Sequence, residues 1–258
     1  MASAGASAAV AFDRLAPGYD QEFGRNPAGL LFRLAFQERL RRLFPPGARV
    51  LDLGCGTGED ALFLASLGVS VHAIDISPAM AERTREKVER AGLGERVQVE
   101  ARGAEDVASA GSDFDGAYSD FGALNCAALG AVGDGLARAL RPGARVLISA
   151  IGRWPLPALV AGWLGVSGRA RTESPRVGGA PVPTRYLVPS ELREALGPAF
   201  QWRDAFALGV LVPGPPQEGW IARHPLAFGA LAAIEGVVRA WPGLRNLGDH
   251  VVVEGMRR

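Results

Sequence analysis

Apolar runs alternate with segments of helical period from about residue 48 to residue 151. This alternation is typical of repeated β-α units, which build a parallel sheet with helices on both faces. The apolar runs predict strands near residues 49–54, 69–75, 97–102, 114–120 and 144–151, and later runs predict strands near 200–212 and 250–256. We therefore predict an α/β fold with a doubly wound, mostly parallel, seven-stranded sheet of the Rossmann-like type.

Two irregular segments, residues 152–189 and 213–247, interrupt this rhythm. The first is rich in proline and glycine, and within it residues 177–188 fit a hairpin and an extended loop about equally well. The second opens with Pro-Gly-Pro-Pro and continues into an apolar helix near residues 226–241. The first contains too much Trp and Leu for a disordered linker. We interpret them as insertions that cover a site.

The charge pattern argues against a nucleic-acid partner. The 258 residues carry a net charge of +1, and the arginines and the single lysine, Lys87, are interspersed with acids. Phosphate binding needs a concentrated basic surface, which this distribution does not provide. We expect solvated helix faces and ion pairs instead.

Cysteine use and hydropathy suggest a compartment. Cys55 and Cys126 have neither a metal-ligand spacing nor the number that a disulfide scaffold needs. Residues 1–10 lack the basic start of a secretory signal. The longest strongly apolar stretch, residues 156–166, is about half of the roughly 20 residues that a membrane span requires. We expect a cytoplasmic protein without membrane insertion.

A glycine-rich turn follows the first predicted strand. Residues 49–58 read Arg-Val-Leu-Asp-Leu-Gly-Cys-Gly-Thr-Gly, and glycines at 54 and 56 allow the backbone to turn sharply and approach a ligand closely. Asp75 ends the next apolar run, where a carboxylate can accept hydrogen bonds from both hydroxyls of a ribose. This pairing predicts a site for a nucleotide-like cofactor.

The residue after the turn narrows the choice of cofactor. A dinucleotide fingerprint needs a third glycine or a small residue at position 59, where this chain has Glu59. Glu59 and Asp60 would repel a diphosphate, but both suit the start of a helix. The turn therefore favours a phosphate-free cofactor over a nicotinamide dinucleotide, although NAD(H) binding stays an alternative to test.

Four stretches resemble class I S-adenosylmethionine-dependent methyltransferases. Residues 50–58 resemble the first motif of that family, and residues 71–77 resemble its second strand with the ribose-binding acid. Residues 103–106 resemble the loop after the third strand, and residues 114–121 resemble the fourth strand, whose end faces the methyl group. The family usually carries an Asp where this chain has Gly103, so the resemblance leaves the contact to the adenine amino group to the Ala104 backbone and to Glu105 or Asp106.

The resemblance implies S-adenosylmethionine as the cofactor, S-adenosylhomocysteine as the product, and a set of binding residues. Gly54 and Gly56 would admit the methionine part, and Asp75 the ribose. The other implied cofactor-binding residues are Tyr19, Ile76, Ala104, Glu105, Ser119, Asp120 and Phe121. Plainer roles stay open for four of them: Tyr19 as a packing residue, Asp75 as a cap of the next helix, Glu105 as a helix-start acid, and Phe121 as a core residue.

The sequence gives fewer signals for the residues that would bind or deprotonate the methyl acceptor. His72 and His250 fall within or at the start of predicted strands, so we expect them to be structural. His224 is the remaining histidine that could serve as a base, with a plain helix-start role as its alternative. The acceptor-side candidates are therefore His224 and Asp120 for catalysis, and Asn125, Tyr186 and His224 for the substrate. We expect no metal, because no His/Asp/Cys cluster has ligand spacing.

The combined prediction is methyl transfer to the oxygen or nitrogen of a small, apolar metabolite. We expect one domain over residues 1–258, with a helical cap (1–48), a cofactor-binding core (49–151) and the two insertions as a substrate lid. The oligomer would be a monomer or a homodimer. Two alternatives remain: methylation of carbon, and a non-catalytic S-adenosylmethionine-binding protein that docks a partner through its apolar surface.

Overall fold

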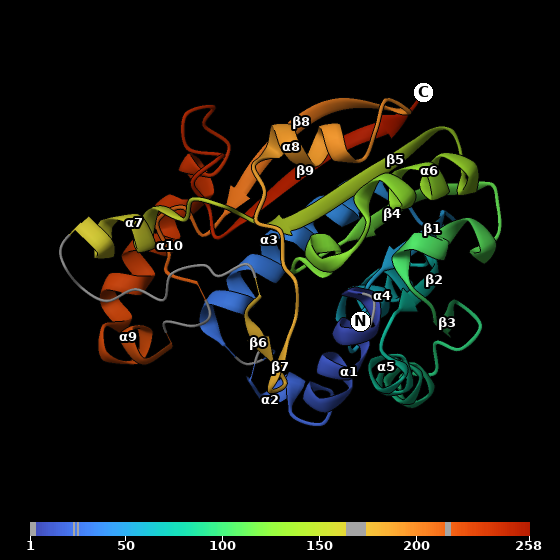
Figure 1. Ribbon diagram of the computed structural model, residues 1–258, viewed down its shortest axis with the longest axis horizontal. Helices are drawn as coiled ribbons and strands as arrows, with labels where there is room; N and C mark the ends of the chain where they lie inside the picture. The colour runs from blue at the N-terminus through green and yellow to red at the C-terminus, as the bar shows by residue number, and fades with distance from the viewer. Residues whose placement is uncertain (1–3, 23, 25, 164–173, 215–217) are drawn as a thin grey trace.

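The computed structural model of the chain describes residues 4–22, 24, 26–163, 174–214 and 218–258. The main strands are β1 (Arg49–Leu53), β2 (Ser70–Asp75), β3 (Val97–Ala101), β4 (Phe114–Ser119), β5 (Leu140–Ile151), β8 (Phe200–Leu208) and β9 (His250–Arg257). They form one seven-stranded sheet in the order β3-β2-β1-β4-β5-β9-β8 (Figure 1). The first five pair in parallel, and β9 runs antiparallel to both of its neighbours. The predicted α/β fold is confirmed.

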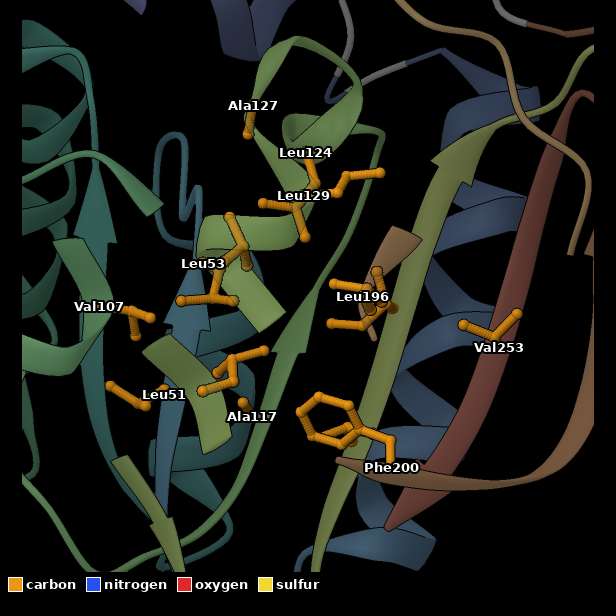
Figure 2. Packing of buried hydrophobic residues seen from close by; sticks show 14 of the residues in the cluster. Leu51, Leu53, Val107, Ala117, Leu124, Ala127, Leu129, Leu196, Phe200 and Val253 are labelled. Atoms are coloured by element: carbon orange, nitrogen blue, oxygen red, sulfur yellow. The ribbon is translucent and has the colours of Figure 1, made fainter. Parts of the chain in front are cut away.

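Helices cover both faces of this sheet. They are α1 (Ala4–Leu15), α2 (Tyr19–Glu22), α3 (Pro27–Leu43), α4 (Glu59–Ser66), α5 (Pro78–Arg90), α6 (Leu129–Ala139) and α8 (Pro189–Ala195), with the 3-10 turns η1 (Ala104–Ala110) and η2 (Ala123–Cys126). Val50 belongs to a buried cluster with residues of α3, α4 and α5. Leu51 and Leu53 belong to a second cluster with residues of η1, α6 and α8, which Figure 2 shows. Successive strand side chains thus point to opposite faces, and both faces are apolar.

Short sequence signals start two of the helices. Asn26 caps α3 by accepting the amide of Ala28 at 3.0 Å, and Pro27 occupies the first helical position. Ser77 caps α5 in the same way through the amide of Met80, at 3.1 Å, again with a proline next in the chain. These caps satisfy amides that the first turn leaves without partners.

The remaining elements lie beyond the sheet. They are α7 (Leu156–Trp163), the short antiparallel pair β6 (Arg176–Val177) and β7 (Ala180–Pro181), α9 (Glu218–Arg223) and α10 (Pro225–Val238). Helices α7, α9 and α10 gather at one end of the molecule, past the end of β5 (Figure 1). Within the described ranges, no helix has the length and the apolar character needed to cross a bilayer.

The structure differs from the predicted strand limits by more than one residue in two places. Strand β5 begins at Leu140, four residues before the predicted start at 144, because the pairing with β4 shifts between Phe114 and Gly116 and admits the exposed Pro142. Strand β8 ends at Leu208 instead of residue 212, since the amides that follow turn toward Glu235. Residues 177–188 are partly hairpin and partly extended, so each alternative holds for part of that segment.

Candidate functional site

The glycine turn after β1 approaches β2 closely. Gly54 and Gly56 have φ angles of 78° and 54°, and the amide of Gly54 donates to the carbonyl of Ile74 at 2.8 Å. A Cβ at Gly54 would overlap the side chain of Ala123 in η2. A Cβ at Gly56 would meet no heavy atom of the described residues within 4 Å, so this backbone borders open space. The turn therefore leaves room for a ligand beside Gly56.

Asp75 lies at the end of β2, beside that space. Its Oδ2 accepts the amide of Gly56 and its Oδ1 accepts the amide of Ser77, both at 2.8 Å. Burial, with a smaller effect from Asp13, raises the pKa of Asp75 to about 6. Each carboxylate oxygen retains a second lone pair. Asp75 therefore orders the chain around it and can still accept ribose hydroxyls, so the two predicted roles are compatible.

The adenine side is formed by a residue that follows β2 and by the start of η1. The half-buried Ile76 reaches within 3.8 Å of the place where a Cβ on Gly103 would stand. Ala104 begins η1 next to them. Glu105 also borders this position, because its Oε2 lies 3.2 Å from the place of that Cβ, while its Oε1 accepts the amide of Ala128 at 2.9 Å just before α6. Ile76 and Glu105 thus both stand beside the bare backbone at Gly103, and their contact with adenine stays a prediction.

The last residue of β4 and the one after it behave differently. The Ser119 hydroxyl is buried and donates to the carbonyl of Leu53 at 2.7 Å, so it ties β4 to β1. Asp120 is also buried, but among the described residues neither of its oxygens has a well-formed hydrogen bond, and nor does the Ser149 hydroxyl. Unsatisfied buried polar groups cost about 1–3 kcal/mol each. A ligand that carries an N–H or a positive charge would remove this cost.

The charges around Asp120 also favour a ligand with a positive charge. Burial, followed by the neighbouring Asp60 carboxylate, raises the pKa of Asp120 well above its usual range, while Arg33 opposes the shift. Arg33 lies 3.6 Å from Asp60 on the α4 side. Two buried acids that share one arginine cannot both ionise without a further cation. The ammonium or sulfonium group of a cofactor beside Asp120 would supply that cation.

Phe121, the next residue, holds an aromatic cluster at the end of β4. Its φ of 48° is in the left-handed region, which is rare for a bulky side chain. The guanidinium of Arg33 lies 4.7 Å from the centre of its ring, and the His250 ring lies 5.6 Å away. Phe32 completes the cluster at 6.0 Å from His250.

Tyr19, at the start of α2, lies near both acids of the site. Burial raises its pKa to about 12, Arg33 lowers it, and Asp75 and Asp120 raise it further. The Tyr19 hydroxyl is thus within electrostatic reach of the acids that end β2 and follow β4. Its role in cofactor binding stays a prediction.

Asp20 links helix α2 to the glycine turn. Asp20 accepts the Thr57 hydroxyl at 2.6 Å and pairs with Lys87 at 2.8 Å. Lys87 also pairs with Glu59 at 2.6 Å, so the chain's single lysine joins α2, α4 and α5. In α1, Asp13 accepts the Ser77 hydroxyl at 2.6 Å. The N-terminal helices are thus fastened to the elements that surround the site.

This architecture is shared with known proteins. Residues 50–143 match the family described as "Methyltransferase domain". The malonyl-[acyl-carrier protein] O-methyltransferase of Enterobacter lignolyticus is 31% identical over 206 residues, which cover 79% of this chain and 71% of that protein. The chain belongs to the class I S-adenosylmethionine-dependent methyltransferases. Its cofactor is S-adenosylmethionine, in agreement with the fit of the turn, Asp75 and Asp120.

Other relatives share parts of the chain or its fold. The ubiquinone/menaquinone biosynthesis C-methyltransferase UbiE of Geotalea daltonii is 30% identical over 145 residues, 53% of this chain and 60% of that protein. This methyltransferase thus spans less than two thirds of that relative. The solved structure of the [4+2]-cyclase SpnF has a TM-score of 0.67 at 18% identity and covers 99% of this chain and 97% of its own, which shows the fold.

Of the predicted substrate residues of the methyltransferase, Asn125 lies in η2 and Tyr186 lies in the segment after β7. The buried Asn125 donates to the carbonyl of Ile151 at 3.2 Å and accepts the amide of the same residue at 2.9 Å. Its side chain also donates to the carbonyl of Arg185, so its amide group is occupied by backbone. Tyr186 is half-buried, and its carbonyl accepts Arg153 at 3.1 Å. Their substrate roles stay predictions.

The histidines are distributed differently from expectation. His224 is exposed at the junction of α9 and α10, with its ring 5.2 Å from that of Trp220, so it does not join the cluster at the end of β4. His250, which the sequence suggested to be structural, contacts Phe121 there, and its Nδ1 lies 3.1 Å from Asp249 Oδ2. The only sequence signal for His250 is an acid directly before a histidine at a strand start.

Metal ligands are not gathered at this site. Across the part of the chain that the structure describes, no three His, Cys, Asp or Glu side chains come together as a metal centre would need.

Proposed function

We propose that this methyltransferase methylates an oxygen or nitrogen of a small, apolar metabolite. The observation that carries the proposal is the aromatic cluster at the end of β4. Phe121, Phe32 and His250 stand edge to face, and Arg33 lies against the Phe121 ring. Phe121 is half-buried, with Phe32 and His250 buried behind it, and an apolar surface of this kind suits a small ring or chain better than a polar polymer.

The segments around the sheet support an enclosed acceptor. We propose that residues 1–48 act as a cap and that 152–189 and 213–247 form a lid, all within one domain. The bonds from Asp13 and Asp20 fasten α1 and α2 beside the cofactor region, where a protein or RNA substrate would need an open groove. A cytoplasmic location and a monomeric or homodimeric state belong to the same proposal.

Methyl transfer from this cofactor requires the enzyme to position the acceptor more than to activate the methyl group. The bound cofactor supplies a methyl group that its sulfonium already activates. Asp75 orients the ribose, and Asp120 neutralises positive charge near the end of β4, so that acceptor and methyl can be held in line while the aromatic cluster excludes water. An acceptor hydroxyl must also lose its proton.

We propose His250 as the group that accepts this proton, with the Asp249 carboxylate, 3.1 Å from its Nδ1, offsetting the positive charge that the ring gains. Asp120 is the second candidate at the same end of β4. The exposed His224 could act only if the junction of α9 and α10 moved toward the site.

A screen with isotope-labelled methyl donor tests the function. The purified enzyme is incubated with the small-molecule fraction of its native cell extract, and labelled products are identified by mass spectrometry and NMR. We expect an O-methyl or N-methyl product, and His250→Asn should lower kcat far more than His224→Asn.

Three outcomes of this screen would change the proposal. A carbon-bound methyl group would replace oxygen or nitrogen as the acceptor atom. Label on protein or RNA would contradict the small acceptor. Cofactor binding with no transfer would favour a non-catalytic binding protein, and a fold shared with a cyclase makes this control necessary.

A further inference from the structure

Large apolar side chains are exposed mainly on one part of the molecule. Of ten such residues in the described ranges, nine lie on α3, on or beside α7, or on or just after α10, and only Val10 lies elsewhere. We call six of them the lid face: Leu159 and Val160 on α7, and Leu226, Ile234, Val237 and Trp241 along α10 and just beyond. Figure 1 shows α7 beside α10, and Leu156 of α7 packs with Val238 of α10.

The outward side of α10 carries no charge. Its one charged residue, Glu235, is buried and accepts the amides of Val210 and Leu211, both at 2.8 Å. On the other side of the helix, Leu226 is 89% exposed and Val237 is 64% exposed. A contiguous apolar surface of this kind is unusual on a protein that meets only water.

Cations border this surface. From residue 219 to residue 248 the only acid is the buried Glu235, while Arg223 is exposed before α10 and Arg245 is half-buried after it. The exposed Glu218 stands at the start of α9. A second copy of the same face would bring arginines against arginines. Apolar residues bordered by arginines instead complement a surface of anionic lipid.

The exposed tryptophans and the length of α10 also fit a lipid surface. Trp154 and Trp241 are 50% and 55% exposed, and tryptophan prefers the boundary between lipid and water. Helix α10 has 14 residues, about 21 Å at the usual rise, which is shorter than the roughly 30 Å core of a bilayer. It can lie in the plane of a membrane surface but cannot cross it.

We propose that the lid face rests on a lipid bilayer that contains anionic lipid, with α10 among the headgroups. This inference goes beyond the proposed function and does not depend on the identity of the acceptor.

Vesicle flotation with the full chain tests the inference. We expect the protein to float with vesicles of equal parts phosphatidylcholine and phosphatidylglycerol, less with phosphatidylcholine alone, and less at high salt. Val237→Asp and Ile234→Asp should each lower the bound fraction by roughly tenfold or more, since a carboxylate is costly in the apolar layer. Arg223→Gln should weaken binding about fivefold, and only to the anionic vesicles.

The chain offers a matched control in Val10→Asp. Val10 on α1 is 48% exposed, close to the 52% of Ile234, so the same substitution there should leave flotation unchanged. Circular dichroism melts and calorimetry with S-adenosylhomocysteine establish that each variant is folded.

Several results would overturn the inference. One is failure of the folded wild type to float with either vesicle, and another is equal loss in Val10→Asp. A concentration-dependent dimer in sedimentation that Val237→Asp dissociates, without flotation of the wild type, would assign the lid face to a second copy.

Discussion

The cofactor core and the segments that cover it are held together by different kinds of contact. In the core, Asp75 binds amides of Ser77 and Gly56, which are 2 and 19 residues away. By contrast, Arg39 of α3 joins the N-terminal cap to β8 and β9 through Asp204 and Glu254, which are 165 and 215 residues away. The contacts of the glycine turn thus form between residues near one another in sequence, whereas the cover attaches to the sheet through distant elements that must first meet.

The largest effect should come from filling the core turn. Gly54→Ala adds a Cβ that overlaps Ala123 at a φ of 78°, so we expect it to lower the unfolding free energy by about 3 kcal/mol and to abolish cofactor binding. Gly143→Ala is the matched control, since Gly143 has a φ of 81° and its Cβ would meet nothing within 4 Å. It should cost only about 1 kcal/mol. Chemical denaturation measures both, and equal losses would mean that backbone strain alone governs the turn.

This contrast explains how far the sequence could be interpreted. The strands of the core were predictable because each apolar run is bounded by local turn residues, and the glycine turn with Asp75 follows a known spacing. The bend at residues 209–212, where the sequence predicts more strand, was not predictable, because the group that binds the amides of residues 210–212, Glu235, comes more than 20 residues later. The place of His250 against Phe121 likewise depends on β9 pairing beside β5.

The next largest effect should appear in the cover. Glu235 accepts the amides of Val210, Leu211 and Val212 at 2.8, 2.8 and 3.3 Å, and Glu235→Gln turns an N–H group toward one of these donors. We expect a loss of about 2 kcal/mol, seen as faster amide exchange at 210–212 and in α10. Cofactor affinity should stay within about twofold if core and cover are separable.

The exposed Glu218 supplies a control for this change. Glu218→Gln removes a carboxylate from α9 and should leave exchange unaltered. A Glu235→Gln protein that loses cofactor affinity as strongly as it loses protection would show that the cover and the core act as one unit, against the comparison drawn above.

The smallest expected effect is a pH dependence that separates binding from stability at Asp75. Because burial raises its pKa from 3.8 to about 6, its contribution to the stability of the cofactor-free fold is complete below pH 3.8 and is lost as pH rises through 6. Ribose hydroxyls favour the ionised carboxylate, so cofactor affinity should change in the opposite direction. It should fall by about tenfold between pH 7 and pH 5, and binding near pH 5 should release a proton.

Calorimetry in buffers of different ionisation enthalpy measures that proton, and Asp75→Asn should remove it and flatten the pH profile. Asp115→Asn is the control, because Asp115 in β4 pairs with Arg141 at 2.8 Å, away from the glycine turn. Asp120, whose pKa is also raised, would contribute a change of the same sign. If the pH dependence of cofactor affinity persists in Asp75→Asn but disappears in Asp120→Asn, the proton released on binding comes from Asp120 after β4 and not from Asp75 beside the ribose.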